Sequence, residues 1–175
     1  MKSSNYLLEC CVDSAYSARM AKKGGADRLE LCSNLVIGGT TPTLALYEQI
    51  RNQTDIRIHV LIRPRFGDFL YSEDETALIC KEIDAFRAAG ADGVTCAKVG
   101  EAEVMADGGV DDIFIAYPMV GDFRVRRVIA LAKRLRRLIL GVDSLEIAKP
   151  LSAAAVEAGV TLEVRLEVDT GAKRT

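Results

Sequence analysis

The protein has 175 residues, of which 49% are apolar and 27% charged, which is enough for one domain with a packed core. Its 23 Lys and Arg residues nearly balance 25 Asp and Glu residues, so the net charge of −2 gives no whole-chain attraction to nucleic acid or to an anionic membrane. No stretch approaches the roughly 18 consecutive apolar residues of a membrane span, and residues 1–6 lack the apolar segment of a signal peptide. We therefore expect a cytoplasmic protein, in which a local basic cluster could still hold a small anionic ligand.

The chain carries five cysteines, an odd number whose spacing does not match a disulfide framework: Cys10, Cys11, Cys32, Cys80 and Cys96. In a reducing compartment, cysteines of this kind are more often buried thiols or metal ligands than bridges. The sequence therefore leaves both roles open for each of them.

Seven short apolar runs predict β-strands. Two of them, residues 56–62 and 138–142, are continuous rather than alternating, which is typical of strands buried on both faces of a parallel sheet. The predicted strands are residues 7–12, 28–32, 56–62, 93–96, 112–117, 138–142 and 161–168.

Amphipathic segments between these runs predict six helices, several of which stop at glycine. Ser72 and Glu75 have the spacing of a capping box at the start of one of them. The predicted helices are residues 14–23, 42–51, 72–89, 99–107, 123–135 and 144–158. Residues 124–137 carry a basic cluster without interleaved aromatic residues, which indicates a solvated helix face rather than a nucleic-acid site.

Alternating strands and helices predict parallel strands joined by helical crossovers. The first strand is followed by Asp13, Ser14, Ala15 and Tyr16 rather than by a glycine-rich phosphate turn, which disfavours a dinucleotide-binding sheet. We expect a single α/β domain over residues 1–175, a TIM (β/α)8-like barrel that is incomplete with about seven strands. An open barrel exposes strand edges, so the chain could be a fragment or could close as a homodimer.

Polar residues and cysteines of the first half gather at the ends of the predicted strands, where barrel enzymes place their sites. Four stretches resemble the CutC family of copper homeostasis proteins over about residues 7–93. They are Leu-Glu-Cys-Cys-Val-Asp-Ser at 8–14, Gly-Ala-Asp-Arg-Leu-Glu-Leu-Cys-Ser at 25–33, Gly-Gly-Thr-Thr-Pro-Thr at 38–43 and Ile-Arg-Pro-Arg-Phe-Gly-Asp-Phe-Leu-Tyr-Ser at 62–72.

The resemblance implies a TIM barrel, a cytosolic location and a role in copper handling. It places Cys11 and Cys32 at the positions of the family's suggested Cu(I)-binding thiols. The soft Cu(I) ion prefers thiolate ligands, and the two cysteines come from neighbouring predicted strands. Cys10 should point to the opposite face of its strand. The alternative is that all these thiols are small buried apolar groups.

The same strand ends also allow an enzymatic interpretation. Arg63 and Arg65 could bind a phosphate or carboxylate, because arginine suits bidentate anion recognition, and Glu9 and Glu30 could act as acid and base. Alternatively, both arginines form ion pairs with Glu9, Glu30 or Asp68. The single histidine, His59, lies in an apolar run, and we expect it to be a core residue.

The second half, residues 93–175, resembles a different family, the alanine racemase-type pyridoxal phosphate barrel of D-threonine aldolase and D-serine dehydratase. The resemblance lies in residues 93–109, 111–118, 142–144 and 166–171. Arg174 matches an arginine near the cofactor in that family, and Tyr117 lies in the matching strand, but the family's Schiff-base lysine belongs to the first barrel strand. That strand is CutC-like here, and Lys98 is not its equivalent, so we do not expect pyridoxal phosphate chemistry.

These two resemblances suggest a hybrid of two barrels, with a CutC-like half over residues 1–92 and a PLP-barrel-like half over residues 93–175. Three functions stay open at this point. The chain could bind Cu(I) through Cys11 and Cys32, act on a small anionic substrate, or be a scaffold without activity.

Overall fold

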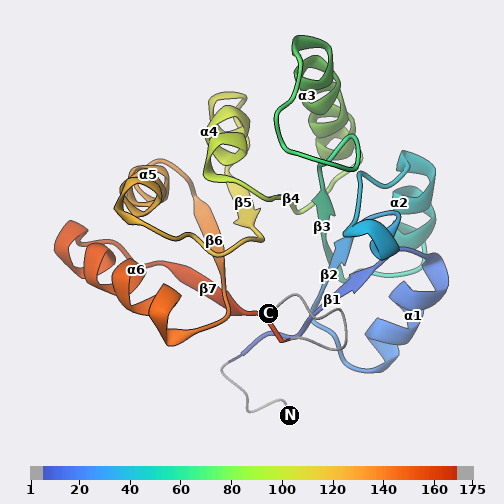
Figure 1. Ribbon diagram of the computed structural model, residues 1–175. Helices are drawn as coiled ribbons and strands as arrows, with labels where there is room; N and C mark the ends of the chain where they lie inside the picture. The colour runs from blue at the N-terminus through green and yellow to red at the C-terminus, as the bar shows by residue number, and fades with distance from the viewer. Residues whose placement is uncertain (1–5, 169–175) are drawn as a thin grey trace. The chain divides into compact units, whose positions relative to one another are not determined.

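The computed structural model describes residues 6–168, in which seven β-strands and six α-helices alternate (Figure 1). The strands are β1 (Glu9–Val12), β2 (Arg28–Leu31), β3 (Arg57–Leu61), β4 (Gly93–Cys96), β5 (Asp112–Ile115), β6 (Arg137–Val142) and β7 (Glu163–Leu166). The helices are α1 (Ala15–Lys23), α2 (Leu44–Arg51), α3 (Glu73–Ala88), α4 (Val99–Asp107), α5 (Asp122–Ala132) and α6 (Leu145–Ala158), with a short 3-10 helix η1 (Leu35–Ile37) between β2 and α2.

The chain divides into two compact units, Met1–Thr95 and Cys96–Thr175, called here the N-terminal and C-terminal units. In the N-terminal unit β1, β2, β3 and β4 pair in chain order, and all pairs are parallel. In the C-terminal unit β5, β6 and β7 do the same. The fold is therefore an α/β fold of the TIM-barrel type, incomplete with seven strands, as predicted from the alternation of elements.

The strands of the N-terminal unit have one apolar and one polar face. Leu29 of β2 pairs with Ile58 of β3, and Leu31 pairs with Val60, and all four side chains are fully buried. Burial of each side chain of this size contributes about 1.5–3 kcal/mol. The residues between them, which point the other way, include Arg28, Glu30 and His59. The apolar face thus belongs to the core, and the polar side chains lie on the opposite face.

Helix starts in this unit follow the sequence closely. The predicted capping box at α3 is present: the Ser72 side chain accepts from the backbone N–H of Glu75, and the Glu75 carboxylate accepts from the N–H of Ser72. Helix α2 begins two residues later than predicted, because Thr43 rather than a residue before Pro42 caps it. The helix η1 was not predicted.

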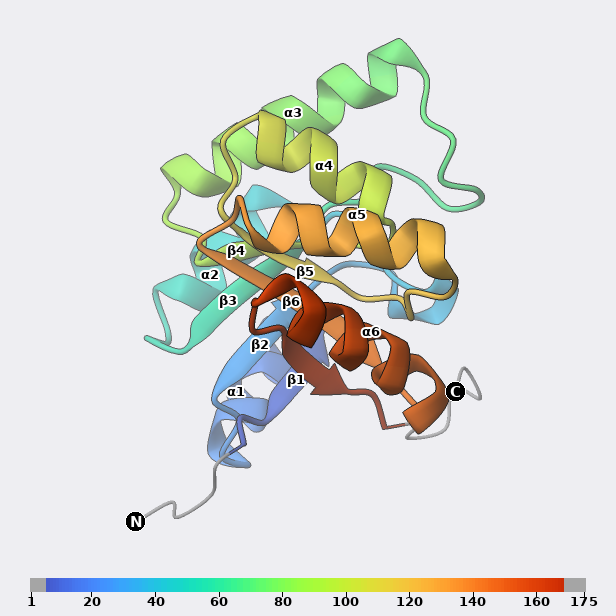
Figure 2. The ribbon, with the colours of Figure 1, turned by 90° about the vertical axis from the view of Figure 1, so that its left-hand side faces the viewer.

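In the C-terminal unit, α5 and α6 lie beside β6 and β7 (Figure 2). Its basic cluster is used in ion pairs: Arg127 pairs with Glu103, Arg134 with Asp107, and Arg136 with Asp111. These pairs join α5 and the turn after it to the α4–β5 segment, so the basic residues are tied to acidic neighbours on the surface. Within the described residues, no helix has the length and apolar character needed to cross a bilayer.

Candidate functional site

The polar face of β1, β2 and β3 is arranged in rows that follow the strand register. In the first row Glu9 pairs with Arg28. In the second row Cys11 pairs with Glu30, which in turn pairs with His59. Side chains that are paired across parallel strands point to the same side, so these residues share one face. Cys32 lies two residues beyond Glu30 and continues the same face.

The structure brings together the two cysteines that the sequence singled out. The backbone N–H of Cys32 donates to the Val12 carbonyl oxygen, so the ladder between the strands extends to this residue. A strand spacing of about 4.8 Å and a rise of about 3.3 Å per residue place the Cα atoms of Cys11 and Cys32 about 8 Å apart. Disulfides need about 4.4–6.8 Å. The pair therefore suits a bridging atom better than a disulfide.

The two thiols differ in their surroundings. Cys11 is exposed, and its Sγ donates to Glu30 Oε2 at 3.5 Å, whereas Cys32 is 2% exposed and its Sγ lies 3.6 Å from the Val12 carbonyl oxygen. Loss of solvent around the thiol, followed by the Glu30 charge, raises the pKa of Cys11 strongly. The same two causes raise the pKa of Cys32 to about 12. Both groups are therefore protonated thiols at neutral pH.

The proposed acid–base residue Glu9 is held in an ion pair. Its carboxylate accepts from Nε of Arg28, a side chain that is only 2% exposed. Within the described residues, Nη1 of Arg28 is buried without a hydrogen-bond partner. The pair lies one row below Cys11 and Glu30, at the amino-terminal end of the strands. The Glu9 carboxylate is thus engaged with the Arg28 guanidinium.

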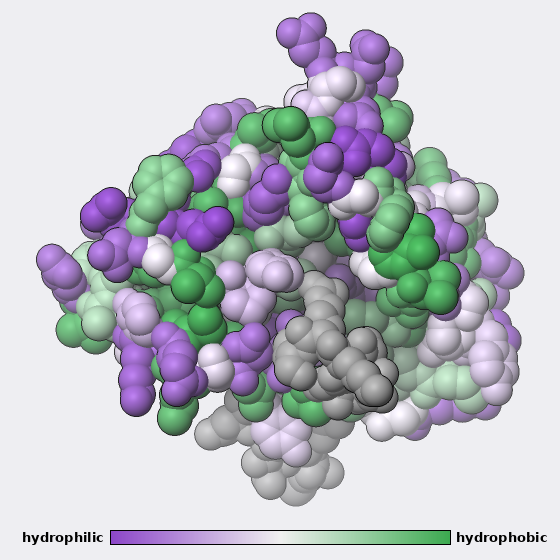
Figure 3. Space-filling model, in the orientation of Figure 1, coloured by the Kyte–Doolittle hydropathy of each residue, from purple (hydrophilic) through white to green (hydrophobic). Residues whose placement is uncertain are grey.

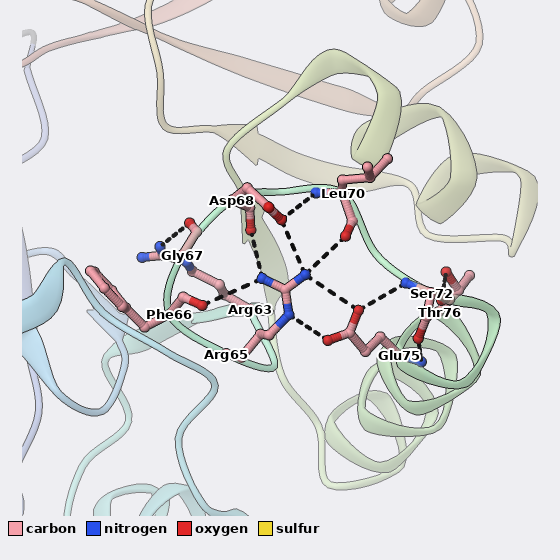
Figure 4. A network of polar contacts seen from close by, with 9 residues as sticks. All are labelled: Arg63, Arg65, Phe66, Gly67, Asp68, Leu70, Ser72, Glu75 and Thr76. Carbon is pink, nitrogen blue, oxygen red and sulfur yellow. Dashed lines mark hydrogen bonds and ion pairs between the residues drawn. The ribbon is translucent and has the colours of Figure 1, made fainter.

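Arg65 occupies the centre of a polar network in the β3–α3 loop (Figure 4). Its guanidinium pairs with Glu75 and with Asp68, and it also donates to the carbonyl oxygen of Leu70 at 2.9 Å. The hydrogen bond from Arg65 lowers the pKa of Glu75. The ion pair with Asp68 is one of the two alternatives left open by the sequence. An anion would have to displace these carboxylates to reach Arg65.

Arg63, which is 9% exposed, connects two loops rather than facing solvent. Its Nη1 donates to the carbonyl oxygens of Gly39 at 3.0 Å and Gly38 at 3.4 Å, and its Nη2 donates to the Gly67 oxygen at 3.2 Å. Its guanidinium also lies 4.9 Å from the centre of the Phe69 ring. Within the part of the chain described, Nε of Arg63 has no hydrogen-bond partner.

His59 is fully buried on β3, as expected for a core residue. Among residues 6–168, no three His, Cys, Asp or Glu side chains are grouped so that they could hold a metal ion together. A divalent ion such as Zn²⁺, which takes four ligands in structural sites, therefore has no built site in this part of the chain. Among the described residues, Cys11 and Cys32 are two soft sulfur donors that come from adjacent strands.

Glu82 on α3 was missed by sequence reasoning. It accepts a hydrogen bond of 3.0 Å from the hydroxyl of Thr41, whose own oxygen accepts from the backbone N–H of Arg63. Burial raises the pKa of Glu82. Its spacing could have revealed it, because it lies three residues after Ile79 and four before Phe86, two buried residues of the same helix.

Fold and site together define a barrel-type α/β protein with a pair of thiols where its first two strands end. Residues 6–113 match the CutC family. A CutC family protein of Chromobacterium violaceum is 35% identical over 178 aligned residues, covering 97% of this chain and 69% of that protein. The chain belongs to the CutC family.

The human copper homeostasis protein cutC homolog is 42% identical over 109 residues, which are 62% of this chain and 38% of the human protein. The chain thus spans well under half of this relative. Among solved structures, a CutC-type protein from Streptococcus agalactiae has a TM-score of 0.56 at 18% identity and covers 91% of this chain and 98% of its own. This likeness supports the fold alone.

The C-terminal half also matches a second family. Residues 79–175 match the N-terminal domain of alanine racemase, and D-threonine aldolase from Filomicrobium marinum is 34% identical with a TM-score of 0.50, covering 57% of this chain and 26% of its own. The two family matches overlap at residues 79–113, so the CutC match extends twenty residues past the boundary predicted at Gly93. The overlap contains the division between the two units.

Pyridoxal phosphate, which the second family implies, needs a lysine that forms its Schiff base. The resemblance places the Schiff-base lysine on the first barrel strand, and β1 consists of Glu9, Cys10, Cys11 and Val12. Lys98 instead precedes α4, after β4. The residues at the position of the family's lysine therefore do not fit this cofactor.

Proposed function

We propose that this chain binds Cu(I) in the cytoplasm through the thiolates of Cys11 and Cys32. The observation that carries the proposal is their placement: they lie on one face of adjacent parallel strands, at a diagonal spacing too wide for a disulfide. Membership of the CutC family supports a role in copper homeostasis. A reducing compartment keeps both thiols available.

The chemistry of the proposed site follows from its two sulfur atoms. Cu(I) prefers soft thiolate ligands, and each thiol must lose its proton to bind. The pKa values of Cys11 and Cys32 are raised, so the free site holds both protons at neutral pH. Metal binding then releases protons, and the apparent affinity increases with pH. Glu30, which accepts the Cys11 S–H, is placed to receive that proton first.

An anaerobic Cu(I) competition titration with a chromogenic chelator tests the proposal. We expect one tight site per chain, which Cys11→Ser and Cys32→Ser each abolish. Cys80→Ser is the matched control, because Cys80 is exposed on α3. Absence of a tight site, or a site that both substitutions leave intact, would refute the proposal.

The alternative of an anion-binding enzyme has less support. Arg65 already pairs with two carboxylates, and Arg63 donates to three backbone carbonyls. Arg65 is therefore engaged with carboxylates, and the one donor of Arg63 without a partner among the described residues, Nε, is buried. A scaffold without activity is the outcome if neither copper nor inorganic phosphate binds in titrations of the purified chain.

A further inference from the structure

The β2–α2 loop, residues 33–40, closes directly over Cys32. A Cβ atom added to Gly39 would lie 3.7 Å from Cys32 Sγ and 3.5 Å from its Cβ, so the Gly39 backbone packs against this side chain. Such an atom would also lie 2.7 Å from a methyl group of Leu61. Cys32 itself is only 2% exposed. A ligand cannot reach its thiol from this side while the loop is closed.

The loop has a firm base and an exposed apolar tip. Ser33 and Thr40 exchange two backbone hydrogen bonds of 2.9 and 2.8 Å, and the Asn34 side chain donates to the Thr40 hydroxyl at 2.8 Å. The tip, η1, exposes all three of its side chains, and Val36 is 96% exposed. Figure 3 shows hydrophobic atoms gathered over the segment that joins β2 to α2. The tip therefore has few contacts of its own that would hold the loop down.

Arg63 holds the glycine end of this loop together with two bonds inside the loop, from the N–H of Gly39 to the Asn34 oxygen at 3.2 Å and from the N–H of Gly38 to the Leu35 oxygen at 2.9 Å. Its Nη1 donates to the carbonyl oxygens of both Gly38 and Gly39, while its Nη2 binds the next loop at Gly67. Gly38 and Gly39 both have a φ of +86°, a conformation that glycine adopts without strain. Loss of the guanidinium removes two of the hydrogen bonds made by this backbone and should therefore loosen it.

We infer that Arg63 is a positioning residue that holds Gly39 closed on Cys32, so that a ligand reaches this thiol only when the β2–α2 loop opens. This assigns Arg63 to control of access rather than to anion binding. Its consequence for copper uptake rests on the proposed function, whereas closure of the loop over Cys32 does not. The loop would set the rate of metal entry and exit, because it must move before both thiols can bind one ion.

The test measures alkylation of individual cysteines by iodoacetamide, followed by mass spectrometry, without any metal. In the native chain we expect Cys32 to react slowly, at a rate nearly independent of low urea concentrations, because local opening exposes little surface. In Arg63→Met the Cys32 rate should increase at least about tenfold, as expected for loss of bonds from a charged donor. The exposed Cys80 serves as internal reference.

Arg51→Met is the matched control. Arg51 also donates to a backbone carbonyl, that of Ile56 at 3.0 Å, and pairs with Asp92, but it lies at the opposite end of β3. We expect it to lower stability without accelerating Cys32 alkylation at low urea. Equal acceleration by both variants, or a native Cys32 rate that rises with urea as steeply as global unfolding, would overturn the inference. If Arg63→Met does not fold, Arg63→Lys and the urea dependence of the native chain decide the question.

Failure of this inference can be told apart from failure of the copper proposal. If Cys32 alkylation is faster in Arg63→Met but the titration shows no Cu(I) site, closure of the loop by Arg63 is supported and the copper proposal is rejected. If a Cu(I) site depends on both thiols but Cys32 alkylation is unchanged in Arg63→Met, the copper proposal is supported and closure of the loop by Arg63 is rejected.

Discussion

Glu9 and Arg28 form a buried ion pair, so the contribution of each side chain to stability should depend on the presence of the other. The Arg28 side chain is 2% exposed and that of Glu9 is 11% exposed. Removing one partner of such a pair leaves a charge without compensation, which costs about 3–5 kcal/mol. We therefore expect Glu9→Leu and Arg28→Met each to lower the free energy of unfolding by about that amount, measured by urea denaturation followed by circular dichroism.

The double variant should lose far less free energy of unfolding than the sum of the two single losses. Replacing a buried ion pair by apolar residues of similar volume is often neutral, or stabilising by about 1–4 kcal/mol. Arg28 also leaves Nη1 buried without a hydrogen-bond partner in the described part of the chain, and its removal relieves that cost. We expect the double variant to lie within about 1 kcal/mol of the native chain, or above it.

The exposed pair of Lys22 and Asp55 provides a control for this cycle. Their side chains are 47% and 92% exposed, so Lys22→Met should cost less than about 1 kcal/mol. The reasoning would be refuted if Glu9→Leu cost no more than this control, or if the two single losses simply added in the double variant.

Three further predictions concern helix capping and ionisation. Ser72→Ala removes the capping-box acceptor of α3 and should lower the free energy of unfolding by about 1 kcal/mol in the same denaturation assay, whereas Ser72→Thr should retain most of it. Burial raises the pKa of Glu82, so the folded state favours the neutral form of this side chain. Glu82→Gln should therefore stabilise the protein at pH 7 but not at pH 4, measured by thermal unfolding at each pH. An equal change at pH 7 and pH 4 would contradict burial of the charge as the cause. The pKa values of Cys11 and Cys32 are raised above their ordinary 9.0, so the folded state binds more protons than the unfolded state above that value. Stability should therefore fall as pH rises from about 9 towards 12, less so in Cys11→Ser/Cys32→Ser, and an unchanged slope in that variant would argue against these thiols as the source.

Much of the fold could be predicted because its signals are local. The predicted strand at residues 93–96 and the predicted helix at residues 99–107 agree with β4 and α4 at both ends. The ends of β1 and β7 were predicted too long, since hydrogen bonds to a neighbouring strand, which the sequence does not show, decide where a strand ends. The helix η1 was not predicted, and its three apolar residues, Leu35, Val36 and Ile37, are exposed.

The part of the site that could be predicted is the direction in which its side chains point, because side chains alternate between the two faces of a strand. Alternation places Cys11 apart from Cys10, and the register then joins it to Glu30. The partners of Arg63 and Arg65 could not be read in the same way. They are mostly carbonyl groups of loops whose path depends on positive φ values at Gly38, Gly39 and Gly67. Such contacts carry no signature in side-chain pattern.

The most direct test of the copper proposal is X-ray absorption at the copper edge on the chain loaded anaerobically with one equivalent of Cu(I). The proposal predicts a low-coordinate Cu(I) centre whose nearest shell contains two sulfur atoms and which is lost in Cys11→Ser/Cys32→Ser. A nearest shell of nitrogen or oxygen, or an unchanged sulfur shell in that double variant, would contradict the assignment of these two thiols.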